Sequence, residues 1–346
     1  MLDKINTNVY ALCMERKKIF FLKNIKMFNF IRLKPARILS MDQSVRRRGI
    51  TGVSSKTFGR KWFFMPEGKA LFKTFDGSYS SSIANIRMLN EIICYKLAMQ
   101  IGISCAQYIP ANLVNHGKNY VGLASVDILQ PNETFVTYKS FRKIPGYDFG
   151  FNLVDFSQIL DIYVQNGVKI DKQEMLLDMY QKILFDVITF QTDRNITNYC
   201  LIINKKNKSY RPCPLFDNEF AFACDYLDTL DKPFIDFSDI VSTHSLFSKI
   251  FTIEYELASS KRYANIISDI CFLAKKYPDM NLILKNTMKN LNIEQVFCEL
   301  KNEGYEINDD YITYVCELVN KAKEMIAEAY KIKIPKQELQ EYDRIS

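Results

Sequence analysis

The amino-acid sequence predicts an α+β protein with two lobes, with strands dominating the first part of the chain and helices the second. Two short apolar runs, residues 61–64 and 70–75, are joined by the turn residues 66–69, and this pattern indicates a β-hairpin. Beyond about residue 150 the apolar residues recur at helical spacing, most clearly over residues 312–329. The 346 residues are enough for one large domain or for two lobes around a cleft.

The composition is that of a globular protein with a mild positive charge. Hydrophobic residues make up 48% of the chain and charged residues 25%, which excludes a wholly disordered protein. The net charge of +7 is partly local, since basic residues gather before residue 62. We interpret residues 1–50 as a basic extension that mainly aids solubility, with contact to nucleic acid or anionic lipid as the alternative. No recognised DNA-binding pattern accompanies it.

The cysteine and histidine pattern argues against a zinc site or a disulfide framework. Nine scattered cysteines contain no CxxC pair, and the chain has only two histidines, His116 and His244. This usage is typical of a reducing compartment. The apolar run at residues 19–22 is too short for a signal peptide or a transmembrane segment. We therefore expect a cytoplasmic protein, with secretion into a host as an effector left open.

Further elements follow from periodicity and turn residues. A polar loop at residues 78–82 precedes a predicted helix with a serine at its start and Gly102 at its end. Residues 108–114 and 120–129 resume strand character around a glycine turn. Asp171 and Glu174 resemble a capping box, and they begin a long amphipathic helix that is expected to reach Thr192. The buried stripe of the first helix consists of Ile86, Leu89, Ile93 and Leu97.

The residues with the most specific chemistry lie in the polar loop after that long helix. Asp193 and Asn198 are five residues apart there, and an apolar run, a turn and a return run then lead to Asp217. Because a hairpin brings the chain back to its start, we expect Asn198 and Asp217 to be neighbours, with Asp193 on the same loop. Mg²⁺ prefers oxygen ligands. The pattern therefore predicts Asn198 and Asp217 as metal ligands and Asp193 as the group that orients or deprotonates an attacking hydroxyl.

This arrangement resembles the catalytic loop and the metal-binding aspartate of the protein-kinase-like superfamily. The segments LFDVITFQTDRNITNYCLI and PCPLFDNEFAF look like the HipA-like serine/threonine kinases, the toxin kinases of bacterial toxin–antitoxin systems and their relatives. The resemblance covers roughly residues 60–230. It implies a bilobed protein-kinase-like fold with a β-rich N-lobe at residues 51–135 and a mostly helical C-lobe at 136–346 that carries the catalytic loop.

The chain upstream of the loop agrees with this resemblance. GKALFKTF resembles the strand that carries the nucleotide lysine, which makes Lys73 the expected phosphate contact, and the helix after it supplies Glu91 as the expected partner of Lys73. The serine-rich loop falls where such kinases place a flexible, sometimes autophosphorylated loop over the phosphates. By this match residues 121–129 lie near the adenine-binding hinge. The serines implied in nucleotide binding are Ser80, Ser81 and Ser82.

The resemblance implies an ATP- and Mg²⁺-dependent serine/threonine protein kinase whose substrates could include itself. An antitoxin-like partner is also implied. Two alternatives stay open. One is a lipid or small-molecule kinase, because phosphoinositide kinases carry a similar Asp-Arg-x-x-x-Asn loop and the basic N-terminus would favour anionic membranes. The other is a pseudokinase that serves as a binding module, because Asn195 replaces the loop histidine of the family and no clear glycine-rich loop is present.

Overall fold

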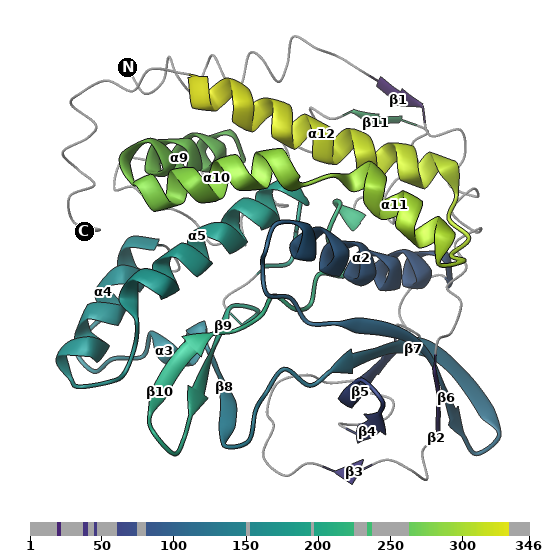
Figure 1. Ribbon diagram of the computed structural model, residues 1–346, viewed down its shortest axis with the longest axis horizontal. Coiled ribbons are helices and arrows are strands. Elements are labelled where there is room, and N and C mark those ends of the chain that lie inside the picture. The colour runs from purple at the N-terminus through teal and green to yellow at the C-terminus, as the bar shows by residue number, and fades with distance from the viewer. Residues whose placement is uncertain are drawn as a thin grey trace.

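The computed structural model combines a curled, mainly antiparallel sheet at the N-terminal side with a helical C-terminal part, as Figure 1 shows. The predicted α+β arrangement is therefore confirmed. The structure describes residues 19–21, 37–40, 45–46, 61–74, 81–149, 153–194, 197–224, 234–236 and 263–331.

Among the described residues, six strands form the larger sheet, in the order β2-β6-β7-β5-β4-β3. Neighbouring strands are antiparallel, except that β2 runs parallel to β6. The β4–β5 and β6–β7 hairpins lie where the sequence predicts them. The strands are β2 (Arg37–Ser40), β3 (Val45–Arg46), β4 (Lys61–Met65), β5 (Gly68–Thr74), β6 (Tyr108–Asn115) and β7 (Lys118–Val126).

Strand alternation directs Lys73 away from the small apolar cluster on one face of this sheet. Phe72 lies in that cluster and is buried, so the next side chain along β5 points to the opposite face. The neighbouring strand β7 approaches β5 closely at Gly122. A Cβ atom at that position would lie 2.3 Å from the carbonyl oxygen of Lys73 and 2.6 Å from Cζ of Phe72. Glycine, which has no Cβ atom, is therefore required at position 122 if β5 is to keep its position.

Helix α2 (Ser81–Gln100) packs between this sheet and the helices of the C-terminal part (Figure 1). The four residues of its predicted apolar stripe are all buried, in the same core cluster as the helical part. Lys96 Nζ lies 2.6 Å from Glu303 Oε1, and Gln100 Nε2 donates to the carbonyl of Asn292 at 3.0 Å. These contacts attach α2 to both ends of α11 (Ile293–Asn302), since Asn292 precedes that helix and Glu303 follows it.

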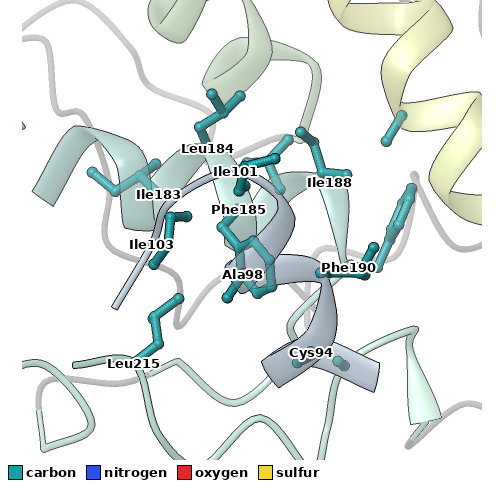
Figure 2. Close-up of a cluster of buried hydrophobic side chains, with 14 of the residues drawn as sticks. Cys94, Ala98, Ile101, Ile103, Ile183, Leu184, Phe185, Ile188, Phe190 and Leu215 are labelled. Carbon is teal, nitrogen blue, oxygen red and sulfur yellow. The ribbon is translucent and has the colours of Figure 1, made fainter. Parts of the chain in front are cut away.

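The long amphipathic helix predicted after residue 171 is α5 (Lys172–Ile188). Asp171 caps it by accepting a hydrogen bond from the Glu174 amide at 3.0 Å. The helix ends at Ile188 rather than at Thr192, because Phe190 has a φ of 47° and the Phe222 amide donates to the carbonyl of Thr189 at 2.6 Å. Figure 2 shows the apolar side chains that α5 and α2 bury against each other.

The other helices complete the C-terminal part. The predicted helix over residues 312–329 lies within the last and longest of them. The helices are α3 (Tyr138–Phe141), α4 (Leu153–Gln165), α9 (Tyr263–Lys276), α10 (Pro278–Asn290) and α12 (Asp309–Lys331).

The hairpin predicted after the catalytic loop is present as β9 (Cys200–Asn204) and β10 (Ser209–Pro212). Its return strand ends at Pro212, earlier than the apolar run suggests, since proline donates no hydrogen bond to a ladder. A third strand, β8 (Glu133–Thr137), was not predicted, and it pairs with β9 on the other side. The chain beyond β10 then bonds to the segment after α2, where the Leu215 amide donates to the carbonyl of Ser104 at 2.8 Å.

Parts of the predicted N-terminal extension form short strands. β1 (Ile19–Phe21) pairs with β11 (Phe234–Asp236), and β2 joins the larger sheet. Ser80 and Asn195 lie outside the described residues, and Ser81 and Ser82 open α2 with side chains that are not described. Of the helices that the structure describes, none is both long enough and apolar enough to cross a lipid bilayer.

Candidate active site

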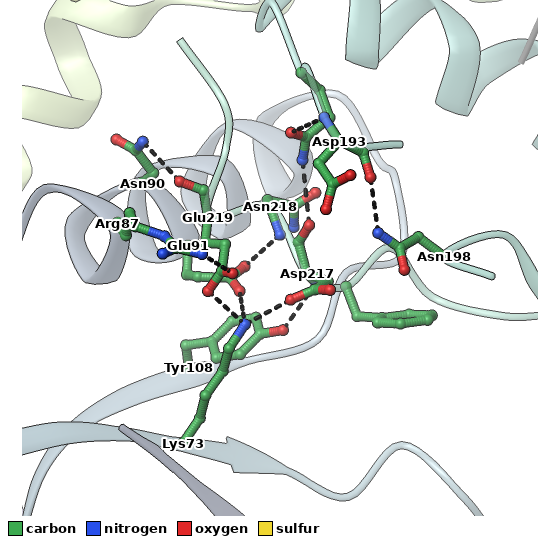
Figure 3. A network of polar contacts seen from close by, with 12 residues as sticks. Lys73, Arg87, Asn90, Glu91, Tyr108, Asp193, Asn198, Asp217, Asn218 and Glu219 are labelled. Atoms are coloured by element: carbon green, nitrogen blue, oxygen red, sulfur yellow. Dashed lines mark hydrogen bonds and ion pairs between the residues drawn. The ribbon is translucent and has the colours of Figure 1, made fainter. Parts of the chain in front are cut away.

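Lys73 of β5 lies at the centre of three carboxylates contributed by two other parts of the chain, α2 and the segment after β10 (Figure 3). Its Nζ is 2.5 Å from Oδ1 of Asp217, 2.8 Å from Oε2 of Glu219 and 3.3 Å from Oε1 of Glu91. Burial alone would lower the pKa of Lys73, but the three carboxylates outweigh it and raise that pKa well above its ordinary value. The ammonium group is therefore charged at neutral pH.

Glu91 is the residue expected to pair with Lys73, and its side chain is fully buried. One carboxylate oxygen contacts Lys73, and the other accepts a hydrogen bond from the Asn218 amide at 2.7 Å. Burial raises the pKa of Glu91 to about 7, although the Lys73 ammonium acts in the opposite direction. Glu91 thus joins the sheet, α2 and the segment after β10. Its role toward a nucleotide stays a prediction.

Asp217 follows the hairpin in a left-handed backbone conformation with a φ of 60°, which aspartate tolerates better than most residues. Its amide donates to the hydroxyl of Tyr108 at 3.1 Å, and its carbonyl accepts from Nε2 of Gln191 at 3.2 Å. Burial alone would raise the pKa of Asp217, but the Lys73 ammonium lowers it below the usual range. The side chain is 33% exposed, so an ionised carboxylate is accessible to a cation.

The structure brings Asp193 and Asn198 to the same site. The amide group of Asn198 donates to the carbonyl of Asp193 at 2.8 Å, which closes the five-residue loop on itself. Gln191 links this loop to Asp217, because it accepts from the Asp193 amide at 3.5 Å and donates to the Asp217 carbonyl. Figure 3 shows the three predicted site residues of the C-terminal part facing one another. The hairpin on which this expectation rests is present, and the roles of the three residues stay predictions.

Arg194 and Asp186 form a buried ion pair that the sequence analysis missed. Nε of Arg194 lies 3.0 Å from Oδ2 of Asp186, and its Nη atoms donate to the Phe216 carbonyl at 2.6 Å and to Oδ1 of Asn218 at 2.5 Å. The hydroxyl of Tyr199 donates to the same carboxylate at 2.8 Å. These contacts fix the loop to the segment that contains Asp217. One signal in the sequence could have revealed this buried pair: Asp186 is a charged residue inside the apolar run LFDVITF.

Glu219 and Arg87 form a second pair that the sequence analysis missed. Their side chains make a short ion pair, and the guanidinium of Arg87 lies 4.0 Å from the centre of the Phe220 ring. Asn90 donates to the carbonyl of Glu219 at 3.1 Å. Among the described residues, ligand oxygens of Glu91, Asp217 and Glu219 lie within 4.8 Å of one another. A glutamate two positions after Asp217 was the available indication in the sequence.

The donor set fits the groups that the sequence implied. Asp217 offers a carboxylate and Asn198 an amide oxygen, both hard ligands of the kind that Mg²⁺ takes in proteins. The Lys73 ammonium is a compact point charge suited to a phosphate. The segment that follows β7 crosses from the larger sheet to β8, and Ile128 in it accepts a hydrogen bond from Arg211 at 3.0 Å. The predicted hinge, residues 121–129, covers the later part of β7 and only the first residues of this crossing, 127–129.

No protein-family model and no curated protein matches the sequence. A solved Helicobacter pylori proinflammatory kinase, CtkA, resembles the structure with a TM-score of 0.61 at 12% sequence identity, over 85% of this chain and 96% of that chain. The chain has a kinase-like fold. The predicted bilobed class is thus confirmed. HipA of Shewanella oneidensis MR-1, solved with HipB and operator DNA, gives a TM-score of 0.42 at 13% identity over 77% of this chain and 61% of that chain.

Proposed function

We propose that this chain is an ATP- and Mg²⁺-dependent phosphotransferase that acts on serine or threonine hydroxyls of proteins. One observation carries the proposal: Lys73 and Glu91 from β5 and α2 meet Asp217 beside the loop of Asp193 and Asn198, within a kinase-like fold. Phosphoryl transfer needs little covalent chemistry from the protein, and this arrangement supplies positioning and charge stabilisation.

Each residue then has a role. The Lys73 ammonium, oriented by Glu91, binds phosphate oxygens of ATP. Mg²⁺ held by Asn198 and Asp217 would neutralise charge on the phosphates. Asp193 orients the acceptor hydroxyl and takes its proton as the hydroxyl oxygen bonds to the γ-phosphorus and the bond to the β–γ bridging oxygen breaks. The products are the phosphoprotein and ADP. The proposal includes an antitoxin-like partner and autophosphorylation among Ser80, Ser81 and Ser82.

A cytoplasmic location is also part of the proposal. Most of the described cysteines are buried or half-buried thiols, which agrees with a reducing compartment.

The direct test is the Asp217→Asn variant, in which asparagine keeps the tolerance for a positive φ. We expect transfer of labelled phosphate from ATP to protein to fall below detection, with an unchanged circular dichroism spectrum. Asp148→Asn, at an exposed position without such contacts in the site, is the matched control and should keep wild-type activity. Wild-type activity in Asp217→Asn would contradict the proposal.

Two assays distinguish the alternatives, and the first is the same phosphate transfer. Labelled phosphate appearing on phosphoinositide vesicles, and not on protein, would identify a lipid kinase. A thermal unfolding scan distinguishes a pseudokinase that binds no ATP from an active kinase, because a ligand that binds the native state must raise the stability of the protein. We expect ATP with Mg²⁺ to raise the Tm of the wild-type protein. No rise together with no transfer would identify a pseudokinase that does not bind ATP.

A further inference from the structure

Lys73 is shared among three carboxylates that differ in how accessible they are. The side chain of Glu91 is 0% exposed and that of Glu219 is 11% exposed, whereas that of Asp217 is 33% exposed. The shortest of the three contacts, at 2.5 Å, is with Asp217. The carboxylate that is open to a metal ion is therefore the one that Lys73 holds most closely in this structure.

This arrangement sets up a competition under the proposed function. A carboxylate that coordinates Mg²⁺ is attracted less to a nearby ammonium, because the two cations repel each other at short range. Binding of the metal by Asp217 thus requires Lys73 to be held by other groups. Glu91 lies 3.3 Å from Lys73 and its second oxygen is occupied by the Asn218 amide, whereas Glu219 lies at 2.8 Å.

Glu219 is fixed in place by the helices around it. Arg87 of α2 forms an ion pair with its carboxylate, and Asn90 of α2 donates to its carbonyl at 3.1 Å. Asn90 in turn accepts a hydrogen bond from the hydroxyl of Tyr311 on α12. Because Arg87, Asn90 and Tyr311 are all buried, Glu219 presents its carboxylate to Lys73 from a fixed frame.

We propose that Glu219 is a positioning residue that keeps Lys73 in the phosphate site when Asp217 turns from Lys73 to the metal ion. Arg87 acts through Glu219, because it orients that carboxylate. This inference rests on the proposed function and deepens it. Without the negative charge at position 219, the Lys73 ammonium stays on Asp217 and competes with Mg²⁺.

The test is calorimetric titration of ATP into the folded protein at a series of Mg²⁺ concentrations. For Glu219→Gln we expect the Mg²⁺ concentration that supports half of the maximal ATP affinity to rise about tenfold, equivalent to about 1.4 kcal/mol. Glu219→Asp, which keeps the charge, should restore most of the loss. Glu306→Gln, at an exposed position, is the matched control and should behave as the wild type.

Three outcomes separate the possibilities. A wild-type protein that binds no ATP at any Mg²⁺ concentration would refute the proposed function and this inference with it. A wild-type protein that binds ATP, with an unchanged Mg²⁺ requirement in Glu219→Gln, would overturn this inference alone. Equal losses in Glu219→Asp and Glu219→Gln would also overturn it, because they would indicate a packing role.

Arg87→Lys provides a second variant that keeps the positive charge and loses the forked geometry. We expect its Mg²⁺ requirement to rise by a smaller factor than that of Glu219→Gln. It serves in place of Glu219→Gln if that variant does not fold, as judged by circular dichroism. A folded Arg87→Lys protein with the wild-type Mg²⁺ requirement would then contradict the inference.

Discussion

Removing one partner of the buried ion pair between Arg194 and Asp186 should be among the most destabilising single changes in the site. Replacing Arg194 by methionine keeps much of the side-chain volume and removes the guanidinium from the Asp186 carboxylate, the Phe216 carbonyl and the Asn218 side chain. Asp186 is 0% exposed and would be left with the hydroxyl of Tyr199. Removing one partner of a buried pair typically costs about 3–5 kcal/mol, because the other charge stays buried without compensation.

We therefore expect Arg194→Met to lower the free energy of unfolding by about 4 kcal/mol, a factor of roughly 1,000 in the folded-to-unfolded ratio. Urea denaturation followed by circular dichroism measures this difference. The matched control is Arg211→Met. Arg211 also pairs with a carboxylate, that of Glu133, whose side chain is 6% exposed, but the Arg211 side chain is 35% exposed, so water can partly replace its guanidinium and its loss should cost less, about 1–2 kcal/mol.

A double variant identifies the source of the loss. Asp186→Asn together with Arg194→Met removes the uncompensated carboxylate, so it should be more stable than Arg194→Met alone, by about 1–3 kcal/mol. If Arg194→Met costs no more than Arg211→Met, the pair does not stabilise the fold. If the double variant is less stable than Arg194→Met, the cost does not arise from the buried charge of Asp186.

Three further predictions follow from local features. Gly122→Ala should cost about 1–3 kcal/mol in urea denaturation and weaken ATP binding, because its Cβ would meet the Lys73 carbonyl oxygen at 2.3 Å and displace β5. Glu91 has a pKa raised to about 7, so it contributes stability below about pH 4.5 that is lost as the pH rises through 7. Glu91→Gln should remove this loss, on the order of 3 kcal/mol, when unfolding at pH 5 and pH 8 is compared. Asp171→Ala removes the cap of α5 and should lower the Tm, at a cost of about 1 kcal/mol.

The elements that the sequence predicted well depend on local patterns. The β4–β5 and β6–β7 hairpins follow from turn residues between apolar runs. Helix α5 begins directly after Asp171, because the Asp171 side chain accepts a hydrogen bond from the amide three residues further on. The proximity of Asn198 and Asp217 is also a local consequence, because a hairpin returns the chain to its starting point. Such features need no knowledge of distant parts of the chain.

The features that escaped prediction depend on contacts between distant segments. Helix α5 ends at Ile188 because the Phe222 amide bonds to the Thr189 carbonyl, which no periodicity reveals. Arg87 and Glu219 are 132 positions apart in the chain, and their pairing follows only from the packing of α2 against the segment after β10. Without an indication of that packing, the sequence identified Glu91 as the partner of Lys73 and missed Glu219.

The ion pairs of Lys73 join the larger sheet to the helical part of the molecule. Most buried apolar residues of the larger sheet form a cluster of their own, whereas α2 belongs to the core of the helical part. The hydroxyls of Tyr311 and Tyr314 on α12 bond to Asn90 and to the Phe222 carbonyl, so α2 and the segment after Asp217 are fixed to the same helix. Lys73 reaches from the sheet into this unit through its contacts with carboxylates. A nucleotide that draws Lys73 onto its phosphates would therefore replace ion pairs between the two packed units by contacts through the ligand, and its binding would be coupled to their relative position.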